Sequence, residues 1–463
     1  MTLRARASLA STGVVGAVLV LLGGLITSVV PTDSWAASFP LRDSMQGRMV
    51  GLALVVAGLG LLSLAWLRLL RAAELGRARI PDVRRITVLW CIPLMLAPPL
   101  FSRDGWSYAA QGELMRLGLS PYVWGPGILD GPIIQGVDTR WMVTPAPYGP
   151  LPLLGGGVAA EVLSDPWLMV IAHRLLAVAG LLALAWAVPR LAGWAGYDGA
   201  VASALVLSSP LMLAHGIGGL HNDLLMVGLA AVALVAARHA GWVAGALVAG
   251  LAASVKAPGG LVCIGLALLS LPAAATLPDR LRRLAQVGVV CVLSLLTVGW
   301  LAGVGQGWID SLYVPASLDT PLSMTSVLGH WVPGVKTVGT TAALGIAAAV
   351  ALRWPTGSPG GAVRGTALVL ATTVLLSPVV HAWYALWCIP IVGACRLGPR
   401  GHAVFLWLSV ALGVSAPLDS SLEGMPVHIA ITTILVVGTV ASVTWAVRPS
   451  ARPVLQPDAG TRP

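Results

Sequence analysis

The chain has 463 residues, of which 57% are hydrophobic and only 10% are charged, and its mean hydropathy is +0.86. So little charge cannot solvate so much apolar surface, and this excludes a soluble globular protein. The net charge of +10 would suit a nucleic-acid-binding protein. The arginines, however, cluster between apolar stretches, which is the positive-inside pattern of membrane proteins. We therefore expect a membrane protein with no nucleic acid partner.

Apolar stretches that approach the ~20 residues of a membrane span recur along the chain. Only helices or closed barrels satisfy the backbone in lipid, and these stretches lack the alternation of barrel strands. We expect an all-α polytopic membrane protein. The stretches are 13–31, 49–67, 86–101, 167–189, 199–214, 224–237, 285–304, 337–352, 365–380, 403–417 and 427–447.

The positions of the arginine clusters predict the topology. If the N-terminus is cytoplasmic and the loops alternate, every arginine cluster falls on the cytoplasmic side. This requires about 14 segments (range 12–14), with 241–254 and 259–275 counted as two short helices. The apolar start of the chain also resembles a signal peptide, but we expect an uncleaved first helix, because its removal would upset this alternation.

The domain organisation follows from this topology. We expect a single transmembrane domain over 1–447 and a short, disordered cytoplasmic tail over 448–463. The longest polar segment, 102–166, is expected to be an outer catalytic loop. Most acidic residues fall on the same side, so we expect the active site on the extracytoplasmic face of the plasma membrane.

Asp104 is the candidate catalytic residue of this outer loop, because it follows an apolar stretch directly. A carboxylate at the lipid–water boundary is partly desolvated and can act as a general base. The alternative is an ordinary interfacial acid paired with Arg103. Tryptophan and tyrosine in the same loop either anchor the membrane interface or stack on sugars.

Two further polar clusters fall at outer helix ends. The segment from His215 to Asp223 holds two histidines, an amide and a carboxylate within nine residues. It can contact substrate, form a hydrogen-bond network, cap a helix or, less readily, bind a metal. The segment from Ser377 to Tyr384 has a similar His/Trp/Tyr content. Several such clusters on one face favour a carbohydrate site.

Lys256 is expected at membrane depth, between the two short helices. A charge there is costly and suggests function, with a lipid-linked phosphate as its partner. Arg174 and Lys336 are lesser candidates for the same role. For all three, the alternative is that the side chain extends to the interface. The five cysteines lie in apolar stretches without disulfide or metal-site spacing, and we expect neither a metal nor another cofactor.

Four motifs together resemble those of a known family. The runs RDGWSYAAQG (103–112), GLHNDLLM (219–226), SVK (254–256) and SPVVHAWY (377–384) resemble motifs of the polyprenol-phosphomannose-dependent α-1,6-mannosyltransferases of the GT-C superfamily. They occur in the family's order over about residues 85–400. Gly105, Trp106 and Ala382 depart from the family pattern, which leaves the subfamily and the acceptor open.

The resemblance implies a GT-C-type multi-helix bundle that moves mannose from a polyprenyl-phosphate-mannose donor to the 6-hydroxyl of a mannan or lipomannan acceptor, with inversion. No nucleotide sugar is used, in agreement with the absence of a phosphate-cradling glycine loop. Asp104 is then the base. The expected ligands of the donor phosphate are Lys256, Arg103 and His221, and those of the sugars and acceptor are Tyr108, Glu113, Asn222, Asp223, His381, Trp383 and Tyr384.

Three alternatives stay open. A secondary transporter or lipid flippase could have a similar number of helices, although its ionisable residues would lie near the midplane. A GT-C enzyme could use another prenyl-phosphosugar. A non-catalytic relative could act as an assembly partner, but such a protein would not need Asp104.

Overall fold

The computed structural model describes residues 2–314, 318–418 and 426–446, and within these ranges it contains helices and no β-strand. The all-α prediction is therefore confirmed. The predicted tail, 448–463, lies outside the described residues. The α-helices are α1 (Leu3–Thr27), α2 (Met45–Glu74), α3 (Ile80–Met95), α4 (Asp104–Arg116), α5 (Pro150–Val162), α6 (Pro166–Trp194), α7 (Gly199–Leu207), α8 (Asp223–Ala240), α9 (Trp242–Val255), α10 (Val262–Ser270), α11 (Leu277–Leu301), α12 (Met324–Gly329), α13 (Val335–Arg353), α14 (Pro359–Leu376), α15 (Ile389–Gly393), α16 (Pro399–Val414) and α17 (Pro426–Ala446).

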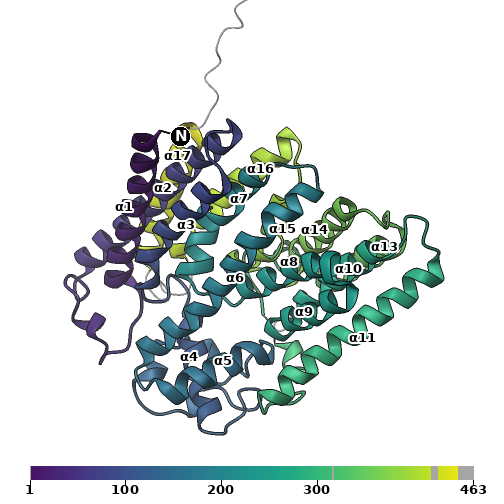
Figure 1. Cartoon of the computed structure of the whole chain (residues 1–463). Coiled ribbons are helices and arrows are strands. Elements are labelled where there is room, and N and C mark those ends of the chain that lie inside the picture. The colour runs from purple at the N-terminus through teal and green to yellow at the C-terminus, as the bar shows by residue number, and fades with distance from the viewer. Residues whose placement is uncertain (1, 315–317, 419–425, 447–463) are drawn as a thin grey trace, which may run out of the picture.

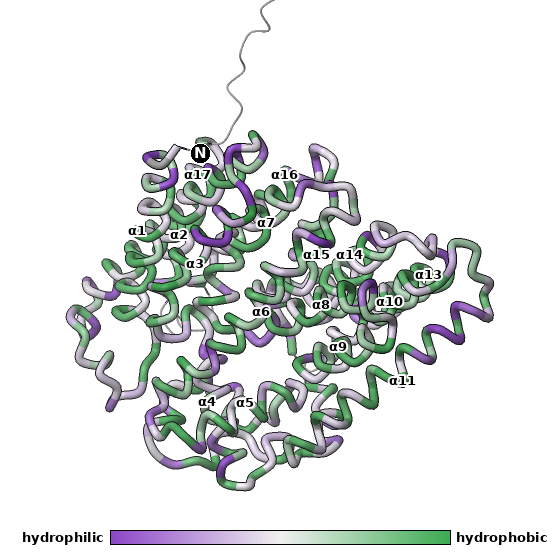
Figure 2. Tube along the Cα trace, viewed as in Figure 1, coloured by the Kyte–Doolittle hydropathy of each residue, from purple (hydrophilic) through white to green (hydrophobic). Residues whose placement is uncertain are grey.

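Eight helices of the described chain are long and apolar enough to cross a bilayer, or nine if one bent pair counts as a span. They are hydrophobic along most of their length, with hydrophilic residues concentrated toward the helix ends and loops (Figure 2). The expected count of about 14 spans is not confirmed. The eight helices are α1, α2, α6, α8, α11, α13, α14 and α17.

Shorter and broken helices occupy several of the other predicted spans. The stretch 199–214 is divided into α7 and a π-helix, η5 (Met212–Gly218), which meet at 63°. Pro210 lies at this break, where its ring and missing N–H disfavour a continuous helix. The predicted pair of short helices is confirmed as α9 and a 3-10 helix, η6 (Ala257–Leu261), that leads into α10, with Lys256 extended between them.

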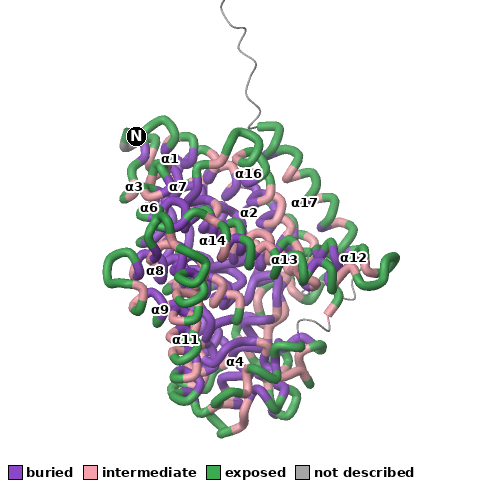
Figure 3. The backbone as a smooth tube through the Cα atoms, turned by 90° about the vertical axis from the view of Figure 1, so that its right-hand side faces the viewer, coloured by how far each residue is buried: buried purple, intermediate pink, exposed green. Residues whose placement is uncertain are grey.

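The long loop 102–166 forms a lobe at one end of the molecule. In Figure 1, α4 and α5 lie at the opposite end from the N-terminus and from the last described turn of α17. The buried residues concentrate in the centre of the molecule, whereas α17 and α12 lie at its exposed edge (Figure 3).

Close backbone contacts attach this lobe to the bundle. At the crossing of α4 and α5, a Cβ added to Gly112 would lie 2.5 Å from the carbonyl oxygen of Gly156, so only glycine fits. Just before α5, the Gly149 N–H donates to the carbonyl of Val255 at 3.0 Å. The segment of the lobe just before α5 is therefore fixed beside Lys256.

Candidate active site

One narrow cavity, about 30 Å³ in volume, brings together the ends of three elements. Asp104 begins α4, Lys256 follows α9, and His381 precedes the 3-10 helix η9 (Ala382–Trp387). Five predicted site residues thus share one cavity, which we call the catalytic cavity. Its walls are Asp104, Trp141, Pro147, Tyr148, Lys256, Val314, Leu318, His381, Trp383 and Tyr384.

Asp104 lies at a helix N-terminus, where the backbone dipole favours a carboxylate. Its side chain is buried, and the Tyr148 hydroxyl donates to Oδ2 at 3.4 Å. His221 Nδ1 is 3.5 Å from the same oxygen. Burial alone would raise the pKa of Asp104, but the interaction with His221 and the nearby charge of Lys256 outweigh it and lower the pKa below its usual value. Asp104 is therefore ionised at neutral pH and able to accept a proton.

Tyr148 stays protonated beside this carboxylate. Burial and the negative charge of Asp104 raise the pKa of Tyr148 well above its usual value, so its hydroxyl remains a donor. The ring of Tyr148 packs edge-on against Tyr108, with centroids 5.2 Å apart. Tyr148 therefore orients Asp104 from the lobe formed by residues 102–166.

Lys256 is buried and surrounded by an acid and aromatic rings. Its Nζ donates to Asp223 Oδ1 at 2.9 Å and lies 4.3 Å from the ring centre of Tyr384. Trp387 and Tyr148 lie farther from it, at 5.2 and 5.6 Å. The Trp387 indole also donates to Asp223 Oδ1. The ion pair and the ring faces compensate the desolvation of the ammonium group.

Trp383 holds two histidines in place. Its ring is stacked on His221 at 4.0 Å and 11°, and on His381 at 4.4 Å and 9°. We expected Trp383 to bind sugar, and this role stays a prediction: in this structure Trp383 lines the catalytic cavity while its ring is stacked on the two imidazoles. Burial lowers the pKa of His381 to about 4, so this ring is neutral at pH 7.

Three other predicted residues lie behind the cavity wall. Tyr108 stacks on His173 at 4.5 Å, and His173 Nε2 lies 2.8 Å from Asn222 Oδ1. Asp223 is fully buried as the partner of Lys256. Several buried polar atoms here make no hydrogen bond within the described protein: the Tyr108 hydroxyl, His173 Nδ1, both His221 ring nitrogens, Asn222 Nδ2 and Asp223 Oδ2.

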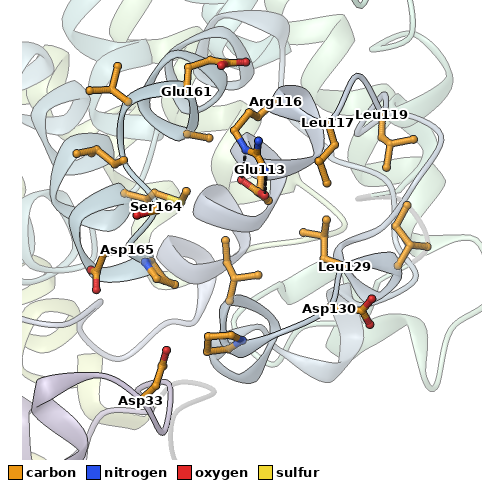
Figure 4. A pocket seen from close by; sticks show the side chains of 18 residues that line it. Asp33, Glu113, Arg116, Leu117, Leu119, Leu129, Asp130, Glu161, Ser164 and Asp165 are labelled. Carbon is orange, nitrogen blue, oxygen red and sulfur yellow. Dashed lines mark hydrogen bonds and ion pairs between the residues drawn. The ribbon is translucent and has the colours of Figure 1, made fainter.

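Glu113, which we expected to bind sugar or acceptor, does not line the catalytic cavity. It lies nine residues beyond Asp104 on α4, and a rise of 1.5 Å per residue separates the two by ~14 Å. Its carboxylate binds Arg116 through two hydrogen bonds, at 2.8 and 2.5 Å. Both side chains line a different cavity of about 930 Å³, together with Asp33, Asp130, Glu161 and Asp165 (Figure 4).

Arg103 is adjacent to Asp104 in sequence but is not part of the cavity wall. Its charge acts instead on Asp138, the loop carboxylate that binds Arg140 at 2.9 Å. Although burial opposes it, the bonds from Arg140 and the charges of both arginines lower the pKa of Asp138. Lys336 pairs with Asp319, also outside the catalytic cavity. Of the predicted ligands of the donor phosphate, Lys256, Arg103 and His221, only Lys256 lines the catalytic cavity.

Sequence reasoning missed Tyr148, His173 and Trp387 as parts of the site. His173 could have been found, because an ionisable residue within a membrane-spanning helix is unusual. Tyr148 and Trp387 could not be distinguished from interfacial aromatic residues. Within the described ranges, no group of three or more His, Cys, Asp or Glu residues is arranged to hold a metal ion.

The fold and the cavity define a polytopic helical membrane protein with a carboxylate and a buried lysine facing one site. Two family models match the chain: "Alpha-(1->6)-mannopyranosyltransferase, N-terminal domain" over residues 10–272, and "MptB C-terminal domain" over 318–445. The chain belongs to the alpha-(1->6)-mannopyranosyltransferase family, which is a family of membrane mannosyltransferases. The family resemblance predicted from the motifs is confirmed.

Relatives agree with this placement. The chain is 31% identical to a probable alpha-(1->6)-mannopyranosyltransferase of Mycolicibacterium smegmatis, over 96% of this chain and 91% of the relative. It is also 31% identical to alpha-(1->6)-mannopyranosyltransferase A of Mycobacterium tuberculosis, over 88% and 84%. The crystal structure of apo ArnT from Cupriavidus metallidurans matches with 16% identity and a TM-score of 0.40, over 73% of this chain and 71% of that one.

Proposed function

We propose that this protein transfers mannose from a polyprenyl-phosphate-mannose donor to the 6-hydroxyl of a mannan or lipomannan acceptor, forming an α-1,6 linkage. The reaction takes place on the extracytoplasmic face of the plasma membrane. The observation that carries the proposal is the catalytic cavity, which is lined by both an ionised Asp104 and the ammonium group of Lys256. A base and a cation are the two groups that such a displacement requires.

The chemistry assigns one role to each group. The acceptor hydroxyl attacks C1 of the mannose on the face opposite to the phosphate. The bond from C1 to the phosphate oxygen breaks, and the hydroxyl proton passes to Asp104, which contributes ~10²–10⁴-fold to the rate. The phosphodiester leaves as a phosphomonoester with one more negative charge, which Lys256 stabilises. Inversion at C1 converts a β-linked donor into an α-linked product.

The buried polar atoms behind the cavity suit sugar binding. Hydroxyl groups can both donate and accept hydrogen bonds, so they can satisfy the Asn222 amide and the Tyr108 hydroxyl. The catalytic cavity is much smaller than a hexose ring. His381 also lines a second, larger cavity of about 420 Å³, which offers more room beside the site.

The test is transfer by the purified protein in detergent. Synthetic prenyl-phosphate donors carrying mannose, glucose or arabinose are each offered with a short α-1,6-mannoside, and the linkage of the product is determined by NMR. The proposal predicts an α-1,6-linked product from the mannose donor. Transfer only from the glucose or the arabinose donor would show that the proposed donor sugar is wrong. No transfer from any donor, together with movement of labelled donor across proteoliposomes, would favour the transporter.

A further inference from the structure

Arg174 lies on α6 with its side chain fully buried, and no carboxylate of the described chain forms an ion pair with it. Its guanidinium group donates only to backbone carbonyls. The four acceptors are Met95 O at 2.8 Å, Ile217 O at 3.1 Å, Pro98 O at 3.2 Å and Gly218 O at 3.3 Å. A guanidinium group has five N–H donors, so this set uses most of its capacity.

These four carbonyls belong to two segments that lead into the candidate active site. Met95 is the last residue of α3 and Pro98 lies in the turn after it, which continues to Asp104. Ile217 and Gly218 end the π-helix η5, and the chain then continues to His221. The segments also touch directly, because the Leu100 N–H donates to Gly218 O at 3.1 Å. One side chain from a third helix therefore connects the segment that carries Asp104 to the one that carries His221.

Both segments contain strained backbone close to the site residues. Phe101, three residues before Asp104, has a φ of 69°, and Leu220, directly before His221, has a φ of 45°. A positive φ is unfavourable for residues other than glycine, and it persists only where the surroundings hold it. Phe101 and Leu220 are both buried. The packing of Phe101 and Leu220 and the hydrogen bonds from Arg174 to the neighbouring carbonyls together hold these backbone conformations.

We propose that Arg174 is a positioning residue that fixes the position of Asp104 relative to His221 and does not itself touch the substrate. This rests on the proposed function. The sequence made Arg174 a candidate for the donor phosphate, but its donors point to the protein backbone. Only a planar guanidinium can span both segments at once, because lysine offers a point charge on a single nitrogen. Arg174→Lys therefore keeps the charge and loses the connection.

The test compares Arg174→Lys and Arg174→Met with Arg190→Lys and Arg190→Met. Arg190 is the matched control, since it lies on the same helix but is exposed and bonds only to Trp186 of its own helix. Hydrogen exchange is measured by mass spectrometry over residues 96–104 and 213–222, with α11 as the internal reference. We expect faster exchange in both segments for the Arg174 variants alone.

Kinetics provide the second readout. We expect Arg174→Lys to lower kcat by about 10- to 100-fold, the effect of a displacement near 1 Å, with little change in the KM of the donor. The acid limb of kcat/KM should move to higher pH. Among the groups that face Asp104, which are His221, Tyr148, His381 and Lys256, His221 contributes most to lowering the pKa of Asp104.

Each outcome decides the proposal. Wild-type exchange in a folded Arg174→Lys protein would overturn it. A higher donor KM with unchanged kcat would also overturn it and make Arg174 a phosphate ligand. If the wild type transfers no sugar, the proposed function fails, and the exchange measurement still decides whether Arg174 holds the two segments. If Arg174→Met does not fold, Arg174→Lys supplies both readouts.

Discussion

Lys256 Nζ lies 2.9 Å from Asp223 Oδ1, and both side chains are buried. The ammonium group that we assign to the leaving phosphate is therefore paired with a carboxylate of the protein itself. Asp223 makes a buried cation tolerable at this depth, and the arriving phosphate shares that cation with it. The pair links the stability of the fold to the chemistry of the site, and this gives a first prediction.

Lys256→Met and Asp223→Asn should each lower the free energy of unfolding by ~3–5 kcal/mol, because each leaves a buried group without its partner. The double variant should recover a large part of this loss, since no unpaired charge remains. It should still lack transferase activity, because the cation is gone. Thermal unfolding in detergent and the transfer assay on the same preparations check both parts. Additive losses in the double variant would show that the pair is not coupled.

His221→Asn should move the acid limb of kcat/KM to higher pH. The interaction with His221 lowers the pKa of Asp104 against the effect of burial, so the loss of His221 raises that pKa. A general base is active only above its pKa. The acid limb of kcat/KM therefore moves to higher pH when the pKa of Asp104 rises. The measurement is a pH–rate profile beside that of the wild type. An unchanged limb would mean that His221 does not set the protonation of Asp104.

Trp383→Ala should reduce kcat more than Trp383→Phe does. The tryptophan ring stacks on His221 and His381, and such aromatic contacts contribute ~0.5–1.5 kcal/mol each. Phenylalanine retains a ring between them, whereas alanine frees both imidazoles. Steady-state kinetics of the two variants give the comparison. If both variants instead raise only the acceptor KM, Trp383 contacts the sugar directly and our assignment is wrong.

Glu113→Gln should leave kcat and both KM values close to those of the wild type. Glu113 binds Arg116 in a separate cavity, and the partly exposed pair contributes only ~0–1 kcal/mol to stability. The same assay and a thermal unfolding curve are sufficient. A large loss of kcat would place the cavity of Figure 4 in the reaction path.

The helical fold and the grouping of Asp104, Lys256 and His381 could be predicted, because each residue adjoins the end of an apolar stretch. The structure brings these three helix ends to one cavity. Glu113 lies outside the catalytic cavity because the rise of α4 carries it away, and its role in acceptor binding stays a prediction. Neither the tertiary stacking on Trp383 nor the carbonyl contacts of Arg174 leave a sequence signal.

The role of Asp104 is tested most directly by mannose transfer from prenyl-phosphate mannose to a short α-1,6-mannoside, with Asp104→Asn compared with wild type and with Glu113→Gln. Binding of the donor is measured in parallel. Our account predicts that Asp104→Asn folds and binds the donor but loses ~10²–10⁴-fold in kcat, while Glu113→Gln keeps its activity. Full activity in Asp104→Asn would contradict the account, because no other carboxylate lines the described catalytic cavity.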